Sequence, residues 1–376
     1  MDQVLISGYY GFKNSGDDAL LLSIIEDLKK QKPDLNIVVL SSNPKETSAV
    51  YGVKSINRYN PFSVIGAMLS SDMLISGGGT LIQDGTSTKS LFYYLSVISL
   101  AHFFRLKIML YSNGIGPLSR GKNIERTRKV LNKVDLITLR DQSSYDELSR
   151  IGVDKPDVVL TADPAFTLAA SSEQAAKDVL SQYGVDFSKP LLCISVRDWN
   201  MVKDDFEDVI ADAVSYAANQ YGFYPVFLPM QPSKDVEISK RIAKKLSCPA
   251  SVIEKAYSNA LTLGMIRYMS LCIGMRLHSL IYSASQCVPL IGLVYDPKIN
   301  GCMDYMGQNL YYDVELLSKG DLEHSIDTVM NDYDGVRETL RTRVANLQKK
   351  AQLNATYAVS LLEKKETGVQ SSGTSK

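Results

Sequence analysis

Short, largely apolar runs alternate along the chain with longer segments whose apolar residues repeat at the helical period. In the first half these runs predict strands at residues 4–10, 36–41, 73–77, 107–113, 136–139 and 158–161. Residues 17–31 predict an amphipathic helix, because apolar side chains recur on one face at Leu20, Leu21, Ile24, Ile25 and Leu28. Strands that are apolar along their whole length are typical of parallel sheets covered by helices on both faces.

The same alternation starts again after the polar stretches at residues 169–176 and 184–190. New strands are predicted at residues 191–196, 225–229, 271–274 and 290–294, and helices at residues 204–220, 236–246 and 277–286. Two successive series of strand–helix units predict two doubly wound, Rossmann-like α/β domains that face a cleft. We place them at residues 1–175 and 185–345. Residues 346–376 follow as a C-terminal helix, within a charged helical segment at 321–365, and a disordered tail at 366–376.

One apolar stretch, residues 91–104, raises the question of membrane contact. It has 14 residues and is closed by Arg105 and Lys107, whereas a spanning helix needs about 20 apolar residues. We expect a buried helix packed on a sheet; the alternative is a surface that meets a membrane or a lipid-linked substrate. The N-terminus runs directly into a strand pattern and shows no signal peptide, so we expect a cytoplasmic protein. If residues 91–104 instead met a membrane or a lipid-linked substrate, the protein would lie at the inner face of the cell membrane.

Composition narrows the partners further. Of the 376 residues, Lys and Arg number 41 and Asp and Glu number 41, so the formal net charge is +0 and no nucleic-acid partner is indicated. The five cysteines are scattered, with no C-x-x-C pair, and neither a metal site nor a disulfide framework is expected.

Polar, glycine-rich loops follow three predicted strands of the first half. In doubly wound sheets, ligands bind outside the carboxyl ends of the strands. The candidate binding residues in these loops are Asn14, Gly16, Asp17, Gly77, Gly78, Gly79, Asp84 and Asn113. The glycine triplet indicates that something comes close to the backbone, and three such loops at one sheet edge favour a binding rim. Asn14 and Asp17 could equally cap the helix that follows them.

Cationic side chains also follow predicted strands. Arg140 comes after residues 136–139; it could pair locally with Asp135 or Asp141, or bind a carboxylate or phosphate. In the second half, Arg276 and His278 follow a strand that ends at Gly274. Lys298 comes after the next strand. Together these side chains predict an anion site with a titratable group, although His278 could also be a structural histidine.

Six segments, in order, resemble the polysaccharide pyruvyl transferase family, especially bacterial members that act in secondary cell-wall polysaccharide synthesis. The resemblance runs from about residue 4 to about residue 307. Its elements are GFKNSGD (11–17), GGGTLIQD (77–84), GIGP (114–117), RDQS (140–143), DPAF (163–166) and MRLHS (275–279).

The resemblance implies a fold similar to that of GT-B glycosyltransferases, phosphoenolpyruvate as the donor and a cyclic pyruvate ketal as the product. It assigns Arg140, Arg276 and Lys298 to donor binding and His278 to catalysis, with the first domain on the acceptor side and the second on the donor side. It also implies an acceptor such as N-acetylmannosamine on a lipid diphosphate, a role in S-layer anchoring, and no cofactor besides the co-substrate phosphoenolpyruvate.

Three other functions compete with this one. A nucleotide-sugar glycosyltransferase of similar architecture would use the same cationic side chains on a diphosphate. A non-catalytic sugar- or anion-binding protein would bind its ligand without catalysing a reaction. A dinucleotide-dependent oxidoreductase is disfavoured, because the G-x-G-x-x-G fingerprint and its acidic ribose partner are missing.

Overall fold

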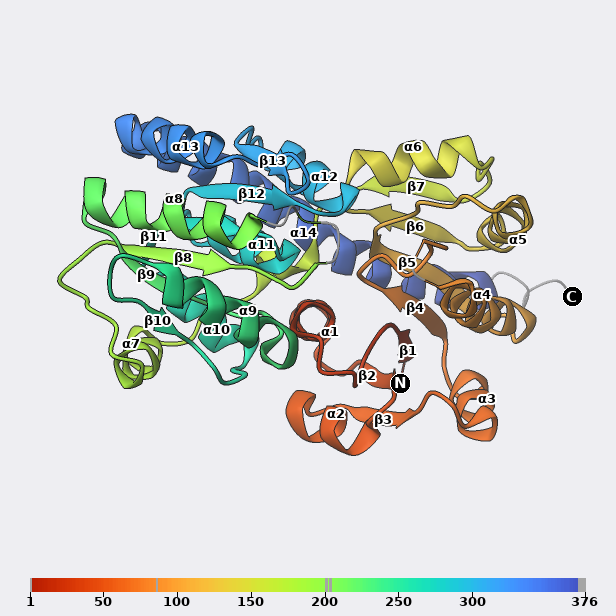
Figure 1. Ribbon diagram of the computed structural model, residues 1–376. Coiled ribbons are helices and arrows are strands. Elements are labelled where there is room, and N and C mark those ends of the chain that lie inside the picture. The colour runs from red at the N-terminus through yellow and green to blue at the C-terminus, as the bar shows by residue number, and fades with distance from the viewer. Residues whose placement is uncertain (1, 86, 200–201, 203–204, 371–376) are drawn as a thin grey trace, which may run out of the picture. The chain divides into compact units, whose positions relative to one another are not determined.

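The computed structural model describes residues 2–85, 87–199, 202 and 205–370. The chain forms two compact units, one made of Met1–Thr167 with Leu347–Lys376 and the other of Leu168–Asn346. The C-terminal segment therefore belongs to the first unit, although the sequence placed residues 346–376 outside both domains. Each unit is built on one parallel sheet with helices on both of its faces (Figure 1).

The sheet of the first unit has the strand order β3-β2-β1-β4-β5-β6-β7, with every neighbouring pair parallel. Its strands are β1 (Gln3–Ser7), β2 (Asn36–Ser41), β3 (Lys54–Asn57), β4 (Met73–Gly77), β5 (Lys107–Asn113), β6 (Leu136–Leu139) and β7 (Asp157–Leu160). Its helices are α1 (Ser15–Gln31), α2 (Pro44–Tyr51), α3 (Pro61–Leu69), α4 (Thr88–Phe103), α5 (Gly121–Leu131) and α6 (Gln142–Arg150), followed by the 3-10 turn η1 (Pro164–Thr167).

The sheet of the second unit has the order β10-β9-β8-β11-β12-β13 and is also parallel. Its strands are β8 (Leu191–Ser195), β9 (Tyr224–Phe227), β10 (Ser251–Val252), β11 (Met269–Gly274), β12 (Leu290–Val294) and β13 (Tyr311–Asp313). Its helices are α7 (Glu173–Gln182), α8 (Phe206–Tyr221), α9 (Pro232–Lys245), α10 (Asn259–Ile266), α11 (Leu277–Ser285), α12 (Pro297–Tyr305) and α13 (Lys319–Asn331).

These sheets confirm the predicted fold class of two doubly wound α/β domains. All ten predicted strands are present, and the described residues also form β3, β10 and β13. The first strand ends earlier than predicted, at Ser7, because the chain turns at Gly8 and Tyr10 folds back, where its hydroxyl donates to the carbonyl of Gly77 at 2.7 Å.

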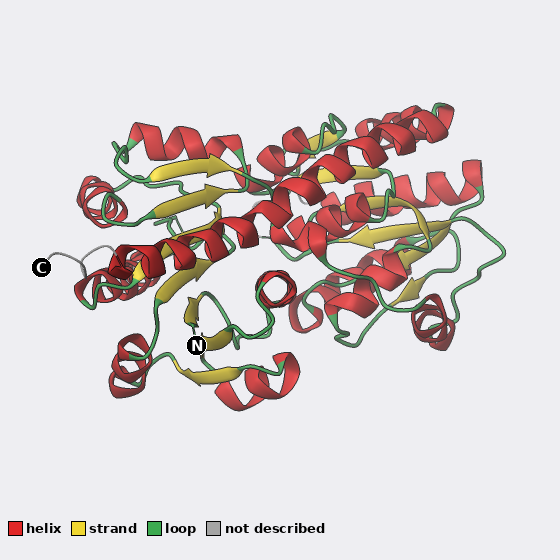
Figure 2. Ribbon diagram, turned by 180° about the vertical axis from the view of Figure 1, so that it is seen from behind, coloured by secondary structure: helices red, strands yellow, loops and turns green. Residues whose placement is uncertain are grey.

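Helix α14 (Tyr333–Gln370) returns the chain to the first unit. Its later residues Ala355, Ala358 and Leu362 are buried against one face of the first sheet, in the same apolar cluster as strands β1, β2, β4 and β5 (Figure 2). Residues 366–370 continue this helix, so the predicted disordered tail is helical there, while residues 371–376 lie outside the described part of the chain.

The apolar stretch at residues 91–104 forms most of α4, and its inner face lies in the core of the first unit. Leu91, Leu95 and Ile98 are buried there, whereas Phe103 at the end of the helix is 76% exposed. Among the residues that the structure describes, no helix is long and apolar enough to cross a membrane.

Candidate functional site

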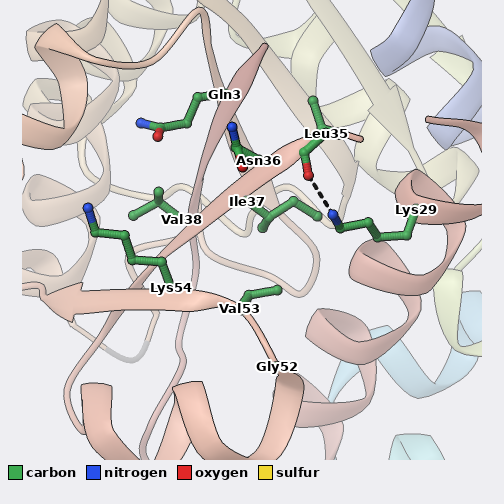
Figure 3. A pocket seen from close by; sticks show the side chains of 9 residues that line it. All are labelled: Gln3, Lys29, Leu35, Asn36, Ile37, Val38, Gly52, Val53 and Lys54. Atoms are coloured by element: carbon green, nitrogen blue, oxygen red, sulfur yellow. Dashed lines mark hydrogen bonds between the residues drawn. The ribbon is translucent and has the colours of Figure 1, made fainter. Parts of the chain in front are cut away.

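The three glycine-rich loops follow β1, β4 and β5, which are neighbours in the first sheet. Because all these strands are parallel, the loops lie at one edge of the sheet, the carboxyl edge, as the sequence predicts. A hollow in the same unit is lined instead by Gln3, Asn36 and Lys54, the first residues of β1, β2 and β3 (Figure 3). In that hollow Lys29 Nζ donates to the Leu35 carbonyl at 2.7 Å. The hollow therefore lies at the opposite edge.

The glycine triplet after β4 is approached closely by other parts of the same unit. A Cβ on Gly77 would come within 2.7 Å of the Tyr10 hydroxyl, and one on Gly79 within 3.1 Å of Asp17 Oδ1. Gly78 and Gly79 also have positive φ angles of 62° and 73°, which disfavour other residues. The close approach that the triplet indicates is thus made by Tyr10 and α1.

Two asparagines organise the same edge. Asn14 caps α1, since its Oδ1 accepts from the backbone N–H of Gly16 at 3.2 Å, and the capping interpretation is confirmed for this residue. Asn113 is fully buried, and its Nδ2 lies 3.4 Å from the carbonyl oxygens of Gly78 and Gly79. Asn113 Oδ1 has no hydrogen-bond partner among the described residues.

Asp84 binds the start of α5. Its carboxylate accepts from the backbone N–H groups of Ser119 and Arg120, at 3.0 and 3.1 Å, and from Asn123 Nδ2 at 2.9 Å. Burial acts to raise the pKa of Asp84, but these hydrogen bonds outweigh it and lower the pKa. A carboxylate so fully engaged is a poor proton acceptor.

Asp17 differs from Asp84, because it lies among phenols. Burial first, and then the charge of Asp17, raise the pKa of Tyr9 and Tyr10. Burial also raises the pKa of Tyr94 to about 12, with a smaller contribution from Asp17. Asp17 is half-buried at the start of α1, so a carboxylate and several phenols gather at the carboxyl edge of the first sheet.

Arg58, which follows β3, is a member of this cluster that the sequence analysis missed. It is 7% exposed, and its Nη1 donates to the Gly8 carbonyl at 2.8 Å. Its guanidinium carbon lies 4.1 Å from the ring centre of Tyr93 and 5.3 Å from that of Phe12. Arg58 thereby fixes the first glycine-rich loop against α4.

Arg140 lies across the carboxyl ends of several strands in the first unit. It is 5% exposed, with Nη1 3.0 Å from Asp163 Oδ2, Nη2 3.0 Å from Thr80 Oγ1 and Nε 3.4 Å from Asp141 Oδ2. A Cβ on Gly114 would come within 3.1 Å of Arg140 Nη2, which explains the small residue there. Of the two local partners considered from the sequence, Asp141 is the one that Arg140 contacts, and Asp163 is an additional one.

In the second unit, Arg276 is the N-cap residue of α11, two residues beyond the end of β11. Its Nε donates to Asp235 Oδ2 at 3.0 Å, and its Nη2 pairs with Asp235 Oδ1 and lies 3.5 Å from Gln231 Oε1. Asp235 is fully buried and also accepts from the backbone N–H of Gln231 at 2.9 Å. Arg276 Nη1 has no partner among the described residues. A buried carboxylate thus orients a guanidinium that keeps donors for a ligand.

His278 and Lys298 start from the same edge. His278 is half-buried on the first turn of α11, with its ring 5.9 Å from that of Tyr282. Lys298 follows β12, the strand next to β11, and its Nζ lies 3.2 Å from Asp296 Oδ2. Within this unit the structure therefore brings Arg276, His278 and Lys298 to the ends of two adjacent strands. Arg197, which follows β8, joins them there and was not singled out from the sequence.

Comparisons with known proteins give one family and one fold. The family model described as polysaccharide pyruvyl transferase matches residues 14–297. The amylovoran biosynthesis protein AmsJ of Erwinia amylovora is 20% identical, over 91% of this chain and 95% of AmsJ.

Among solved structures, a putative UDP-N-acetylglucosamine 2-epimerase from Listeria monocytogenes is similar, with a TM-score of 0.68 at 11% identity over 97% of each chain. HepE from Anabaena, in complex with UDP and glucose, gives a TM-score of 0.60 at 11% identity over 99% of this chain and 100% of HepE. At such identities the likeness concerns the fold alone, which is the GT-B-like pairing of two Rossmann-like domains.

Proposed function

This chain belongs to the polysaccharide pyruvyl transferase family, and we propose that it transfers the pyruvyl group of phosphoenolpyruvate to a sugar of a cell-wall or exopolysaccharide precursor. The match to the family model over residues 14–297 carries the proposal, because it covers most of both units and makes the chain a transferase of polysaccharide biosynthesis. The likeness to AmsJ, a protein of amylovoran biosynthesis, agrees with that role.

The carboxyl edge of the second unit suits the proposed donor. Phosphoenolpyruvate carries a carboxylate and a phosphate, and each is bound best by charge-assisted hydrogen bonds. Arg276, fixed by Asp235, offers Nη1, and Lys298 supplies a second cation at the end of the adjacent strand. In the first unit, Asp163 and Thr80 hold the guanidinium of Arg140 in place, and donor binding by Arg140 is part of the proposal.

His278 is the proposed acid–base group. The methylene carbon of phosphoenolpyruvate gains a proton, and a sugar hydroxyl adds to the cationic carbon next to it. The carbon–oxygen bond to phosphate then breaks, and a second hydroxyl closes the cyclic ketal. The two hydroxyl protons balance the one taken up by carbon and the one that leaves with phosphate. A positioned imidazole that carries such protons contributes about 10²–10⁴-fold to the rate.

The acceptor is proposed to bind at the carboxyl edge of the first unit. Asp17 lies there next to Tyr9, Tyr10 and the glycine triplet, and it is preferred over Asp84, whose carboxylate is held by α5. N-acetylmannosamine on a lipid diphosphate is the proposed acceptor. Such an acceptor would bring the protein to the inner face of the membrane.

The test is phosphate release by the purified protein with phosphoenolpyruvate and a set of synthetic sugar acceptors. We expect release that requires both substrates and is lost in His278→Gln. Release without any sugar would indicate a phosphatase, and turnover of UDP-sugars in place of phosphoenolpyruvate would indicate a glycosyltransferase. Either result contradicts the proposal.

A further inference from the structure

Arg197 lies just beyond the carboxyl end of β8, beside the segment that carries Arg276. Ser195 of β8 is in register with Gly274 of β11, and the backbone N–H of Met275 donates to the Ser195 carbonyl at 2.7 Å. Two residues further along each chain segment come Arg197 and Arg276. The two arginines therefore start side by side at one sheet edge.

The side chain of Arg197 packs against two aromatic rings. Its guanidinium carbon lies 4.7 Å from the ring centre of Tyr295 and 4.9 Å from that of Trp199. Tyr295 follows β12, and β11 lies between β8 and β12 in the sheet. The contact between Arg197 and Tyr295 therefore spans the end of β11, the strand that Arg276 and His278 follow.

Among the residues that the structure describes, Arg197 has no acidic partner, unlike the other two cations of this edge. Arg276 pairs with Asp235 and Lys298 pairs with Asp296. Among the described residues Arg197 makes neither an ion pair nor a hydrogen bond from its side chain, and its Nε is buried without an acceptor. A buried donor without a partner destabilises the folded protein. Such a group calls for an explanation, and a ligand is one.

The aromatic rings hold this guanidinium without neutralising it. The rings of Trp199 and Tyr295 lie 5.0 Å apart, and the guanidinium contacts both. Lys298 Nζ lies 5.3 Å from the centre of the same Tyr295 ring, and the guanidinium carbon of Arg197 lies 4.7 Å from it. The separation of Arg197 and Lys298 therefore cannot exceed the sum of these two distances. Two cations beside one carboxylate, Asp296, leave a local excess of positive charge.

We propose that Arg197 binds an oxyanion of the donor, a carboxylate or a phosphate, with Trp199 and Tyr295 holding its guanidinium over the end of β11. This inference rests on the proposed function and deepens it, since it adds to Arg276 and Lys298 a third cation of the second unit. A planar guanidinium suits bidentate binding of either group, which a lysine ammonium does not reproduce.

The experiment compares Arg197→Gln and Arg197→Lys with the wild type in turnover and in binding. Trp199 is the one tryptophan of the chain, so its fluorescence reports ligand binding beside Arg197 without turnover. The matched control is Arg267→Gln, which removes an exposed arginine just before β11, at the opposite edge of the same sheet.

We expect Arg197→Gln to raise the KM for phosphoenolpyruvate by about 10- to 100-fold, as the loss of a charged hydrogen bond implies, with Arg197→Lys in between. The acceptor KM should not change, and the melting temperature should not fall, because no internal ion pair is lost and a buried donor without an acceptor is removed. Arg267→Gln should behave as wild type. The fluorescence response to phosphoenolpyruvate should shift to the same higher concentrations.

The outcomes separate this inference from the proposed function. If the wild type turns over phosphoenolpyruvate and Arg197→Gln has the same KM, the inference is wrong and the function stands. If the wild type shows no turnover, the proposed function is wrong. A Trp199 fluorescence titration with inorganic phosphate then tests whether Arg197 binds an oxyanion. A Trp199 response that Arg197→Gln abolishes supports an oxyanion site, whereas no response, or the same response in both proteins, overturns it.

Discussion

Replacing Arg140 by methionine removes the charge from a buried ion pair of the first unit. Arg140 is 5% exposed and Asp163 is 0% exposed, with Nη1 and Oδ2 3.0 Å apart. Besides Arg140, Asp163 accepts from the backbone N–H of Ala165 at 3.0 Å. Without the guanidinium a buried carboxylate keeps an uncompensated charge, which costs about 3–5 kcal/mol. For a domain of this size, that loss lowers the melting temperature by roughly 6–20 °C.

Thermal unfolding followed by circular dichroism measures this effect, and the double variant Arg140→Met/Asp163→Asn separates stability from donor binding. The double variant removes the fully buried carboxylate, and Asp141, the second acidic partner of Arg140, keeps its hydrogen bonds from Ser143 and Ser144, so the variant should recover a large part of the lost melting temperature. Its KM for phosphoenolpyruvate should nevertheless stay raised by about tenfold or more, because the proposed contact with the donor is still missing. A wild-type melting temperature in Arg140→Met would refute the buried-pair reasoning, and a wild-type KM in the double variant would refute donor binding by Arg140.

Four further substitutions test separate parts of the account. His278→Gln should lower kcat by about 10²–10⁴-fold at an unchanged melting temperature, and a kcat near that of the wild type would end its assignment as the acid–base group. Asp235→Asn should raise the KM for phosphoenolpyruvate by about tenfold or more, since Arg276 loses the carboxylate that orients it; an unaltered KM in steady-state kinetics argues against that orientation. Asp17→Asn should raise the acceptor KM, whereas unchanged acceptor kinetics would leave helix capping as the role of Asp17. Burial raises the pKa of Asp18 to about 6, so its ionisation destabilises the fold increasingly as the pH rises from about 4 to about 6. Asp18→Asn should therefore stabilise the protein at pH 8, by about 1–3 kcal/mol, but not at pH 4, and an equal effect on the melting temperature at both pH values would contradict this explanation.

The sequence predicts central strands well and edge strands poorly, for a physical reason. Strands such as β4 and β11 are covered on both faces and are apolar except for one serine each, so a simple run of hydrophobic residues reveals them. The edge strand β3, with the sequence KSIN, is exposed at both ends and carries no such run. The edge strand β10 has only two residues, Ser251–Val252.

At the candidate site, the sequence identifies loops and charges but not their partners. Glycine-rich loops and strand-end cations can be read locally, and the structure places them at carboxyl edges. That Asp163 and Asp235 pair with Arg140 and Arg276 depends on neighbours 23 and 41 residues away, which no local pattern encodes. Arg197 belongs to no recognisable motif, and only the rings that surround it set it apart.

The central claim, pyruvyl transfer from phosphoenolpyruvate to a sugar, is tested most directly by mass spectrometry of the acceptor after incubation with phosphoenolpyruvate in deuterated water. The account predicts an acceptor heavier by one ketal-linked pyruvate, with one solvent deuteron in the methyl group and one phosphate released per product. An unmodified acceptor beside free pyruvate and phosphate would contradict it, and so would an acceptor that gains a glycosyl unit from a nucleotide sugar.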